Sequence, residues 1–238
     1  MADGIELSPA LDAFVAEAPL ERRAILAFMT RAAATTAPGA GVLDAGAGQA
    51  PYRELFSHTR YVTCDWEHSP HAGGRSADVV APLDQLPLDS GSFDTVLNTQ
   101  VLEHVADPSA VLAELSRVLV TDGRLWLTVP FVGELHEEPF DFYRYTSHGL
   151  RRLLGEAGFE DIEVEPVGGY FSTLAQLSRN CGLIIGAGTQ RGDVGRRAVA
   201  AAGRAAARVL PALDRLDRRR ALPLGWTVSA RRVRSSSS

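Results

Sequence analysis

Hydrophobic residues along the chain recur with two different spacings, which predict short strands that alternate with helices. Apolar runs with the length of buried strands lie at residues 42–45, 61–65, 77–80, 93–99, 125–129 and 162–167. Helical spacing is found in residues 9–34 and again from Val111 to Leu119, where Asp107 and Pro108 provide a helix start and Gly123 a stop. This alternation predicts an α/β fold built on an open, largely parallel sheet.

The stretch from Gly41 to Trp66 has the pattern of a ligand-binding unit of strand, turn, helix and strand. A buried strand leads into Gly46 and Gly48, where a backbone without Cβ atoms can turn tightly and approach a ligand. Pro51 then suits the first turn of a helix over about residues 51–56, whose free N–H groups we expect to face the ligand. Asp65 follows about 20 residues beyond the turn, where a carboxylate in such a unit meets ribose hydroxyls.

Two nucleotide-type ligands fit this unit, a nicotinamide dinucleotide and a ligand without phosphates such as S-adenosylmethionine. A dinucleotide fingerprint has a third glycine three residues after the second, and Pro51 occupies that position here. Asp44, just before the glycines, also suits an ammonium or sulfonium group better than a phosphate. The pattern therefore favours S-adenosylmethionine, with an NAD-dependent oxidoreductase and an ordinary structural turn as alternatives.

Five segments in register resemble the successive motifs of class I S-adenosylmethionine-dependent methyltransferases, with a type 11-like methyltransferase domain. They are residues 42–48 (VLDAGAG), Asp65, residues 92–97 (SFDTVL), residues 101–105 (VLEHV) and residues 121–125 (TDGRL). The resemblance covers residues 40–165 and implies a Rossmann-like, seven-stranded sheet with helices on both faces and an antiparallel last strand. Residues 224–232 resemble that last strand, which makes the preceding segment a helical insertion between strands six and seven.

We therefore expect a single methyltransferase domain over residues 1–238. Its parts are N-terminal helices (1–38), a core (40–168), the helical insertion (169–222), the last strand (223–234) and a disordered serine tail (235–238). Within the insertion, residues 194–210 show an amphipathic helix pattern whose polar side carries Arg196, Arg197, Arg204 and Arg208. We interpret this helix as a lid or a homodimer contact, with peripheral docking on an anionic membrane as the alternative.

The resemblance places the cofactor at the ends of the first four strands. Asp65 is expected to bind the ribose, and Trp66 either lies near the adenine or packs in the core. Pro82 stands where many relatives have Asp, so adenine recognition is expected from Leu83, Asp84 or backbone groups. The expected cofactor-binding residues are Asp44, Ala45, Gly46, Gly48, Asp65, Trp66, Leu83, Asn98, Thr99 and Gln100.

The segment 135–145 (LHEEPFDFYRY) is the candidate catalytic loop, because it holds one histidine, three acids, one arginine and four aromatics. Methyl transfer is an in-line displacement, so orientation of the nucleophile supplies most of the rate and a base only takes its proton. His136 is the expected base, since an imidazole titrates near neutral pH. Glu137, Asp141 and Tyr143 are the further candidates, and the alternative is a structural loop with internal polar pairs.

Other polar residues near these motifs are expected to have structural roles. Glu103 and His104 are expected to support local structure rather than chemistry. His136, Glu137, Glu138 and Asp141 include metal-ligand types, but adjacent carboxylates of one loop seldom all face one ion, so we expect no metal.

Composition narrows the class of partner and the compartment. A net charge of −5 disfavours a nucleic-acid backbone as the main partner. Two scattered cysteines, Cys64 and Cys181, and no charged-then-apolar leader indicate a cytoplasmic protein. All 24 basic side chains are arginine, which is typical of a GC-rich bacterial genome.

We thus expect an enzyme that transfers a methyl group from S-adenosyl-L-methionine to oxygen or nitrogen of a small or medium-sized acceptor, such as a natural product, a sugar or a lipid-linked molecule. The alternative from another class is a non-catalytic protein that binds the cofactor or regulates a partner.

Overall fold

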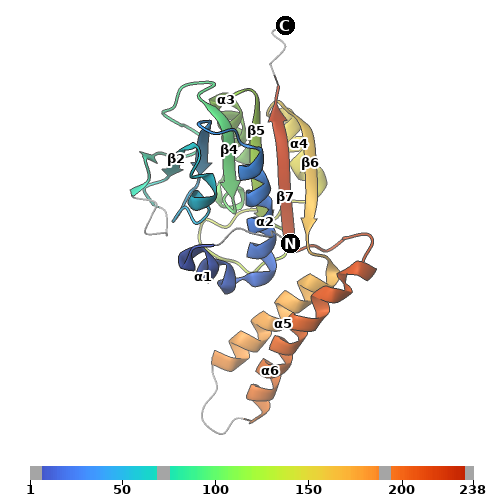
Figure 1. Cartoon of the computed structure of the whole chain (residues 1–238). Helices are drawn as coiled ribbons and strands as arrows, with labels where there is room; N and C mark the ends of the chain where they lie inside the picture. The colour runs from blue at the N-terminus through green and yellow to red at the C-terminus, as the bar shows by residue number, and fades with distance from the viewer. Residues whose placement is uncertain (1–6, 69–75, 188–193, 234–238) are drawn as a thin grey trace.

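The computed structural model describes residues 7–68, 76–187 and 194–233, and within them seven strands form one sheet (Figure 1). The strand order is β3-β2-β1-β4-β5-β7-β6. The strands are β1 (Gly41–Ala45), β2 (Arg60–Asp65), β3 (Val79–Val80), β4 (Phe93–Thr99), β5 (Leu119–Pro130), β6 (Phe159–Val167) and β7 (Gly225–Arg232). Pairs are parallel except that β7 runs antiparallel to both β5 and β6, which confirms the predicted Rossmann-like sheet.

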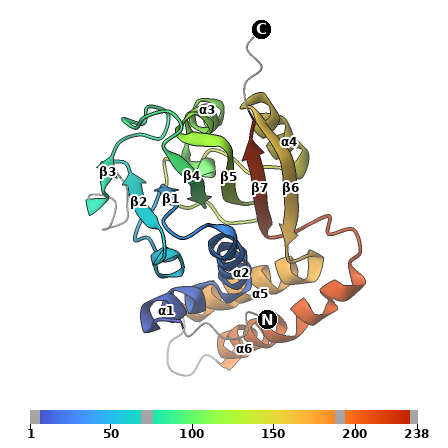
Figure 2. The same cartoon turned by 45° about the horizontal axis from the view of Figure 1, so that its top comes forward.

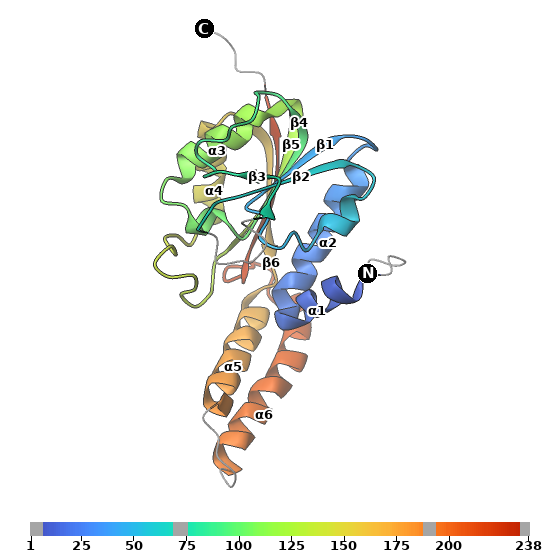
Figure 3. The same ribbon diagram turned by 90° about the vertical axis from the view of Figure 1, so that its left-hand side faces the viewer.

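Helices cover both faces of the sheet (Figure 3). On one face lie α1 (Pro9–Glu17) and α2 (Pro19–Thr35), and on the other lie α3 (Pro108–Val118) and α4 (Ser147–Glu156). Successive residues of a strand point to opposite faces, so in β1 Val42 packs with α1 and α2 while Leu43 and Ala45 pack with α3 and α4. Each face therefore has its own apolar core, and β1 lies between the two.

Three predicted elements differ in extent from those observed. The prediction of an α-helix over residues 51–56 is wrong. The chain forms only a short 3₁₀ helix, η1 (Arg53–Phe56), before β2 begins at Arg60. Strand β3 has two residues, Val79 and Val80. Strand β5 starts at Leu119, six residues early, and its register shifts where Phe93 pairs with Leu119 and Thr95 with Arg124.

The insertion consists of a helical hairpin that projects from the edge of the sheet where β6 ends (Figures 1 and 2). It comprises α5 (Tyr170–Ala187), α6 (Val194–Val209) and the 3₁₀ helix η4 (Leu210–Leu216). The two helices approach closely, since a Cβ added to Gly203 would lie 2.4 Å from the carbonyl oxygen of Ser178. Only Ala200 and Gly203 of α6 are buried, so the alanine side of the helix is exposed as well as the arginine side.

Asp214 and Asp217, which accepts from the N–H of Tyr170 at 2.8 Å, fix the base of the hairpin, and two side chains of α5 fix its middle. Asp214 accepts hydrogen bonds from the N–H groups of Phe171 and Ser172, at 2.9 and 3.1 Å, and thereby caps α5. Arg179 donates to the carbonyl oxygen of Glu17 at the end of α1, and Asn180 donates to Glu134 in the loop after β5. None of the helices in the described part of the chain is long and apolar enough to cross a membrane.

Candidate active site

A cavity of about 900 Å³ opens at the carboxyl ends of β1, β2 and β4, the edge at which open parallel sheets bind ligands. Helices α1 and α2 form part of its wall, so they do more than pack against the sheet. The loop after β5 contributes further lining. Among the lining residues are Phe14, Glu21, Arg22, Gly46, Gly48, Tyr52, Asp65, Trp66, Leu83, Asp84, Thr99, Gln100, Val101, His104, His136, Glu137, Glu138, Phe140 and Phe142.

The glycine turn after β1 forms the floor of this cavity. Gly46 has a φ of +82°, and a Cβ there would lie 2.4 Å from Cγ2 of Val101, so only glycine fits. The N–H of Gly48 donates to Oδ2 of Asp65 at 2.7 Å, and the N–H of Trp66 donates to Oδ1 at 2.8 Å. Asp65 therefore joins the turn to the end of β2, and its carboxylate also faces the cavity.

Three of the ten expected cofactor residues do not line the cavity but support the turn from behind. Asp44 is buried, and it accepts a hydrogen bond of 2.6 Å from the hydroxyl of Tyr61. Burial raises the pKa of Asp44 to about 6, although the Tyr61 hydroxyl opposes the shift. Asn98 is fully buried and donates to the carbonyl oxygen of Ala45 at 2.8 Å, so it supports the turn and does not line the cavity.

The remaining expected cofactor residues all line the cavity. Trp66 lies at the cavity wall rather than in the core, and its ring meets the ring of Phe140 edge to face, with centroids 5.0 Å apart. Leu83 lies beyond β3 on the same wall, next to Asp84. Thr99 and Gln100 follow β4, and Gln100 donates to the hydroxyl of Thr128 at 3.2 Å.

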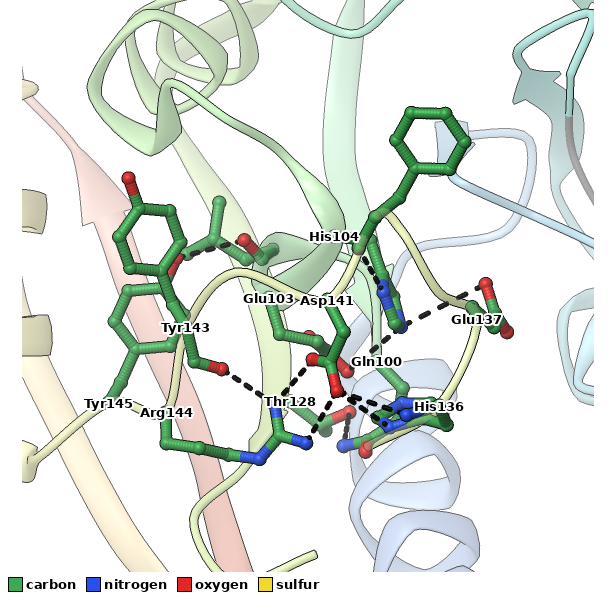
Figure 4. Close-up of polar contacts among 12 residues, drawn as sticks. Gln100, Glu103, His104, Thr128, His136, Glu137, Asp141, Tyr143, Arg144 and Tyr145 are labelled. Carbon is green, nitrogen blue, oxygen red and sulfur yellow. Dashed lines mark hydrogen bonds and ion pairs between the residues drawn. The ribbon is translucent and has the colours of Figure 1, made fainter. Parts of the chain in front are cut away.

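The candidate catalytic loop separates into residues that face the cavity and residues that hold the loop (Figure 4). His136 and Glu137 line the cavity. Asp141 instead pairs with both terminal nitrogens of Arg144, at 2.6 and 2.9 Å. This pairing lowers the pKa of Asp141 to about 2, which makes it a poor base. Tyr143 donates to the carbonyl oxygen of Ala106 and does not line the cavity.

The loop also covers Glu103, which we predicted to support local structure. Its carbonyl oxygen accepts from the N–H groups of Phe142 and Tyr143, and its side chain is fully buried. Neither carboxylate oxygen has a hydrogen-bond partner among the described residues. Burial raises the pKa of Glu103 to about 8. Next to it, His104 reaches the cavity, and its ring meets the ring of His136 edge to face at 4.7 Å.

A further acid enters the site from helix α2. Glu21 lies close enough to His136 and Arg22 for both to favour its charged form, yet burial dominates and raises the pKa of Glu21. Helical spacing predicted this segment as a helix, but no pattern indicated that Glu21 would lie near a loop more than a hundred residues away. The cavity thus has a glycine turn with a ribose-type acid at one side, and His104, His136 and the half-buried Glu21 at the other, with the buried Glu103 next to His104.

This sheet, with its antiparallel last strand and a glycine-turn cavity at its carboxyl edge, is the fold of class I S-adenosylmethionine-dependent methyltransferases. Residues 43–127 match the family model of the methyltransferase domain. This segment is therefore similar to that family, and the predicted cofactor, S-adenosyl-L-methionine, is the one named for its relatives.

Two relatives are each described as a probable S-adenosylmethionine-dependent methyltransferase. A probable S-adenosylmethionine-dependent methyltransferase of Mycolicibacterium smegmatis is 32% identical over 169 residues, which cover 64% of this chain and 65% of the relative. A second, from Mycobacterium tuberculosis, is 31% identical over 134 residues, covering 51% of this chain and 49% of the relative. The chain thus spans from half to about two thirds of the length of these relatives.

Solved structures agree on the fold. A [4+2]-cyclase, SpnF, superposes with a TM-score of 0.57 at 17% identity, covering 89% of this chain and 81% of the cyclase. Phosphoethanolamine N-methyltransferase 2 of Haemonchus contortus superposes with a TM-score of 0.56 at 18% identity, covering 89% of this chain and 53% of that one. These identities support a shared fold and carry no information about the acceptor.

Proposed function

We propose that the protein transfers a methyl group from S-adenosyl-L-methionine to an oxygen or nitrogen of a small or medium-sized acceptor. One observation supports this proposal most directly: the glycine turn, Asp65 and the cluster around His136 all border the same cavity. Its volume of about 900 Å³ is near the upper end of ligand pockets, so a cofactor and an acceptor can lie side by side. A natural product, a sugar and a lipid-linked molecule are the acceptor types that we propose.

The residues of the cavity fit this cofactor. The turn at Gly46 leaves no room for a side chain and brings backbone to the cavity floor, as a ligand held by main-chain contacts requires. Asp65 provides carboxylate oxygens for two ribose hydroxyls, and Trp66 and Leu83 provide flat and apolar surface for an adenine.

When bound, S-adenosylmethionine supplies a methyl carbon on a sulfonium, whose carbon–sulfur bond breaks as the acceptor atom forms its bond to that carbon. The protein has to orient the acceptor and receive its proton. His136 is the proposed proton acceptor because it reaches the cavity and its Nδ1 lies 3.1 Å from the carbonyl oxygen of Glu134. A carbonyl oxygen only accepts hydrogen bonds, so Nδ1 carries the proton and Nε2 has the free lone pair.

The test is calorimetric titration with S-adenosylmethionine, followed by methyl-transfer assays on a panel of hydroxylated and amino acceptors. Asp65→Ala should weaken binding roughly ten- to a hundredfold, because it removes charge-assisted hydrogen bonds to the ribose. Asp89→Ala, at an exposed position outside the cavity, is the matched control and should bind like the wild type. Unchanged affinity in folded Asp65→Ala, or tighter binding of NAD than of S-adenosylmethionine, contradicts the proposal.

His136→Ala should keep cofactor affinity and lower turnover by roughly 10² or more. Cofactor binding without product from any acceptor would instead indicate a non-catalytic, partner-regulating protein.

We propose further that the hairpin is a contact surface, for a second copy of the chain or for an anionic membrane. Leu177, Ile184 and Val199 are exposed on it, and Arg204 and Arg208 are exposed on α6. Sedimentation velocity tests the homodimer. Salt-sensitive co-sedimentation with anionic vesicles that is lost when Arg204 and Arg208 become Gln would identify the membrane contact.

A further inference from the structure

The side chains of Glu103, His104 and His136 form a cluster of three potential metal ligands at the cavity wall (Figure 4). One donor atom from each side chain lies within 4.8 Å of the other two. Oε1 of Glu103 is 3.8 Å from Nε2 of His104. Ligand atoms around a tetrahedral ion with bonds of 2.0–2.1 Å stand about 3.3 Å apart, so small side-chain movements would close this set on an ion.

Apart from the spacing of the donor atoms, the buried carboxylate of Glu103 also indicates that the cluster binds a ligand. A carboxylate that is fully buried and has no hydrogen-bond partner is costly, and native structures rarely keep one without a reason. Its neighbours on the cavity side are the imidazoles of His104 and His136, and in the described part of the chain neither carboxylate oxygen has a hydrogen bond of normal geometry. A cation between Glu103 and the two rings would satisfy this carboxylate.

Both histidine rings are oriented as metal-binding histidines usually are. Nδ1 of His104 lies 2.7 Å from the carbonyl oxygen of Phe140, and Nδ1 of His136 lies 3.1 Å from that of Glu134. Each Nδ1 must therefore donate, which leaves the lone pair of the neutral ring on Nε2. A backbone carbonyl at the second nitrogen is the outer-shell partner that fixes a ligating imidazole.

We propose that Glu103, His104 and His136 bind a divalent first-row transition-metal ion such as Mn²⁺ or Zn²⁺. Two imidazoles and one carboxylate suit these ions better than Mg²⁺, which prefers an all-oxygen shell. Three protein ligands leave open positions, and because both rings line the cavity these positions face the acceptor space. The proposed ligand set differs from the loop residues weighed from the sequence, and it replaces the expectation that the protein needs no metal.

The consequence for the acceptor rests on the proposed methyl transfer. An acceptor with a hydroxyl next to a second oxygen would occupy two open positions of the ion, and its nucleophilic oxygen would be held at a fixed place beside the cofactor. In that state His136 is a ligand, and the acceptor hydroxyl, made more acidic by the ion, would release its proton to solvent. Cation binding itself requires no methyl transfer and is tested first.

The experiment uses the full chain, freed of metal with EDTA and titrated separately with Mn²⁺ and Zn²⁺ by calorimetry, with Mn²⁺ also followed by electron paramagnetic resonance. We expect one ion per chain. Glu103→Gln and His136→Ala should each weaken binding at least about tenfold. Glu138→Gln is the matched control, since Glu138 lies on the same loop and lines the cavity but is outside the cluster.

Absence of binding to the folded wild type, or equal weak binding by the wild type and Glu103→Gln, overturns the proposal. Circular dichroism and S-adenosylmethionine titration on each variant show whether the fold is intact, and Gln keeps the size of the buried side chain. If the metal binds but S-adenosylmethionine does not, the proposed function fails and the metal site stands. If S-adenosylmethionine binds but no metal does, only this inference fails.

Discussion

At the scale of single residues, the site is shaped by carboxyl groups whose surroundings set their charge. Asp141 is held ionised by Arg144, and Asp44 is buried beneath the glycine turn with a single hydroxyl donor from Tyr61. The two acids have nearly the same intrinsic acidity, yet their pKa values move in opposite directions, to about 2 and about 6. Their environments therefore separate a structural anchor from a group that changes charge near neutral pH.

Asp44 makes a testable contribution to the pH dependence of stability. Its pKa is raised from 3.8 to about 6 on folding, so between these values the folded state binds more protons than the unfolded state. Stability from this group is therefore present below about pH 4 and is lost as pH rises through 6, by roughly 3 kcal/mol in total.

We expect the unfolding free energy of the wild type, relative to Asp44→Asn, to fall by about that amount from pH 3 to pH 7 in urea titrations. Asn keeps an oxygen that can accept from Tyr61 but does not titrate. Asp89→Asn, at an exposed position, is the control, and a parallel pH profile of wild type and Asp44→Asn would show that the prediction is wrong.

At the scale of elements, the hairpin depends on its base as well as on contact between its helices. Asp214 accepts from two N–H groups of the first turn of α5, and its second oxygen accepts from the hydroxyl of Ser172 at 2.5 Å. The carboxylate also lies at the positive end of the helix dipole of α5. A single side chain of η4 thus caps the helix that begins the hairpin.

Asp214→Ala should destabilise the hairpin by about 1–3 kcal/mol, because three donors lose their acceptor. Hydrogen exchange should speed up in α5 and leave β1 and β4 unchanged. Asp214→Asn keeps one accepting oxygen and should show a smaller effect. Equal protection of α5 in the wild type and in folded Asp214→Ala would contradict the capping role.

The elements also show what the sequence can and cannot predict. The bounds of α6 followed from arginine spacing to within one residue, because the 3.6-residue period is local information. The short η1 was mistaken for an α-helix, since a proline start signal is common to both. The burial of Glu103 was not predicted for a different reason: it depends on Phe142 and Tyr143, which fold over it from a loop 40 residues away. Spacing could place the glycine turn and Asp65, but not contacts made by tertiary packing.

At the scale of the whole molecule, the hairpin is joined to the sheet at one place. Val167 at the end of β6 pairs with Gly225 at the start of β7, so the two ends of the insertion lie side by side. Among the residues whose side chains the structure describes, none from α5, α6 or η4 lines the cavity. The hairpin instead contacts two segments that contribute lining residues, α1 through Glu17 and the loop after β5 through Glu134.

Replacement of residues 172–222 by a short flexible linker should therefore leave S-adenosylmethionine affinity within about threefold of the wild type. The linker spans two neighbouring strand ends, so its closure costs little entropy. Acceptor methylation should fall strongly, because the loop after β5 loses its tether. Calorimetry and turnover measurements on the same preparation separate the two effects. Loss of cofactor binding by a folded deletion variant would refute this division of roles.

The adjacent tethers at Arg179 and Asn180 give α5 a mechanical property. The helix has 18 residues, which makes it about 27 Å long, and the tethers lie near its middle. One tether reaches α1 and the other reaches the loop after β5, so a tilt of α5 about its capped base displaces both walls of the cavity together. Binding of a partner at the far end of the hairpin would therefore act on α1 and on the loop after β5, which both contribute residues to the cavity.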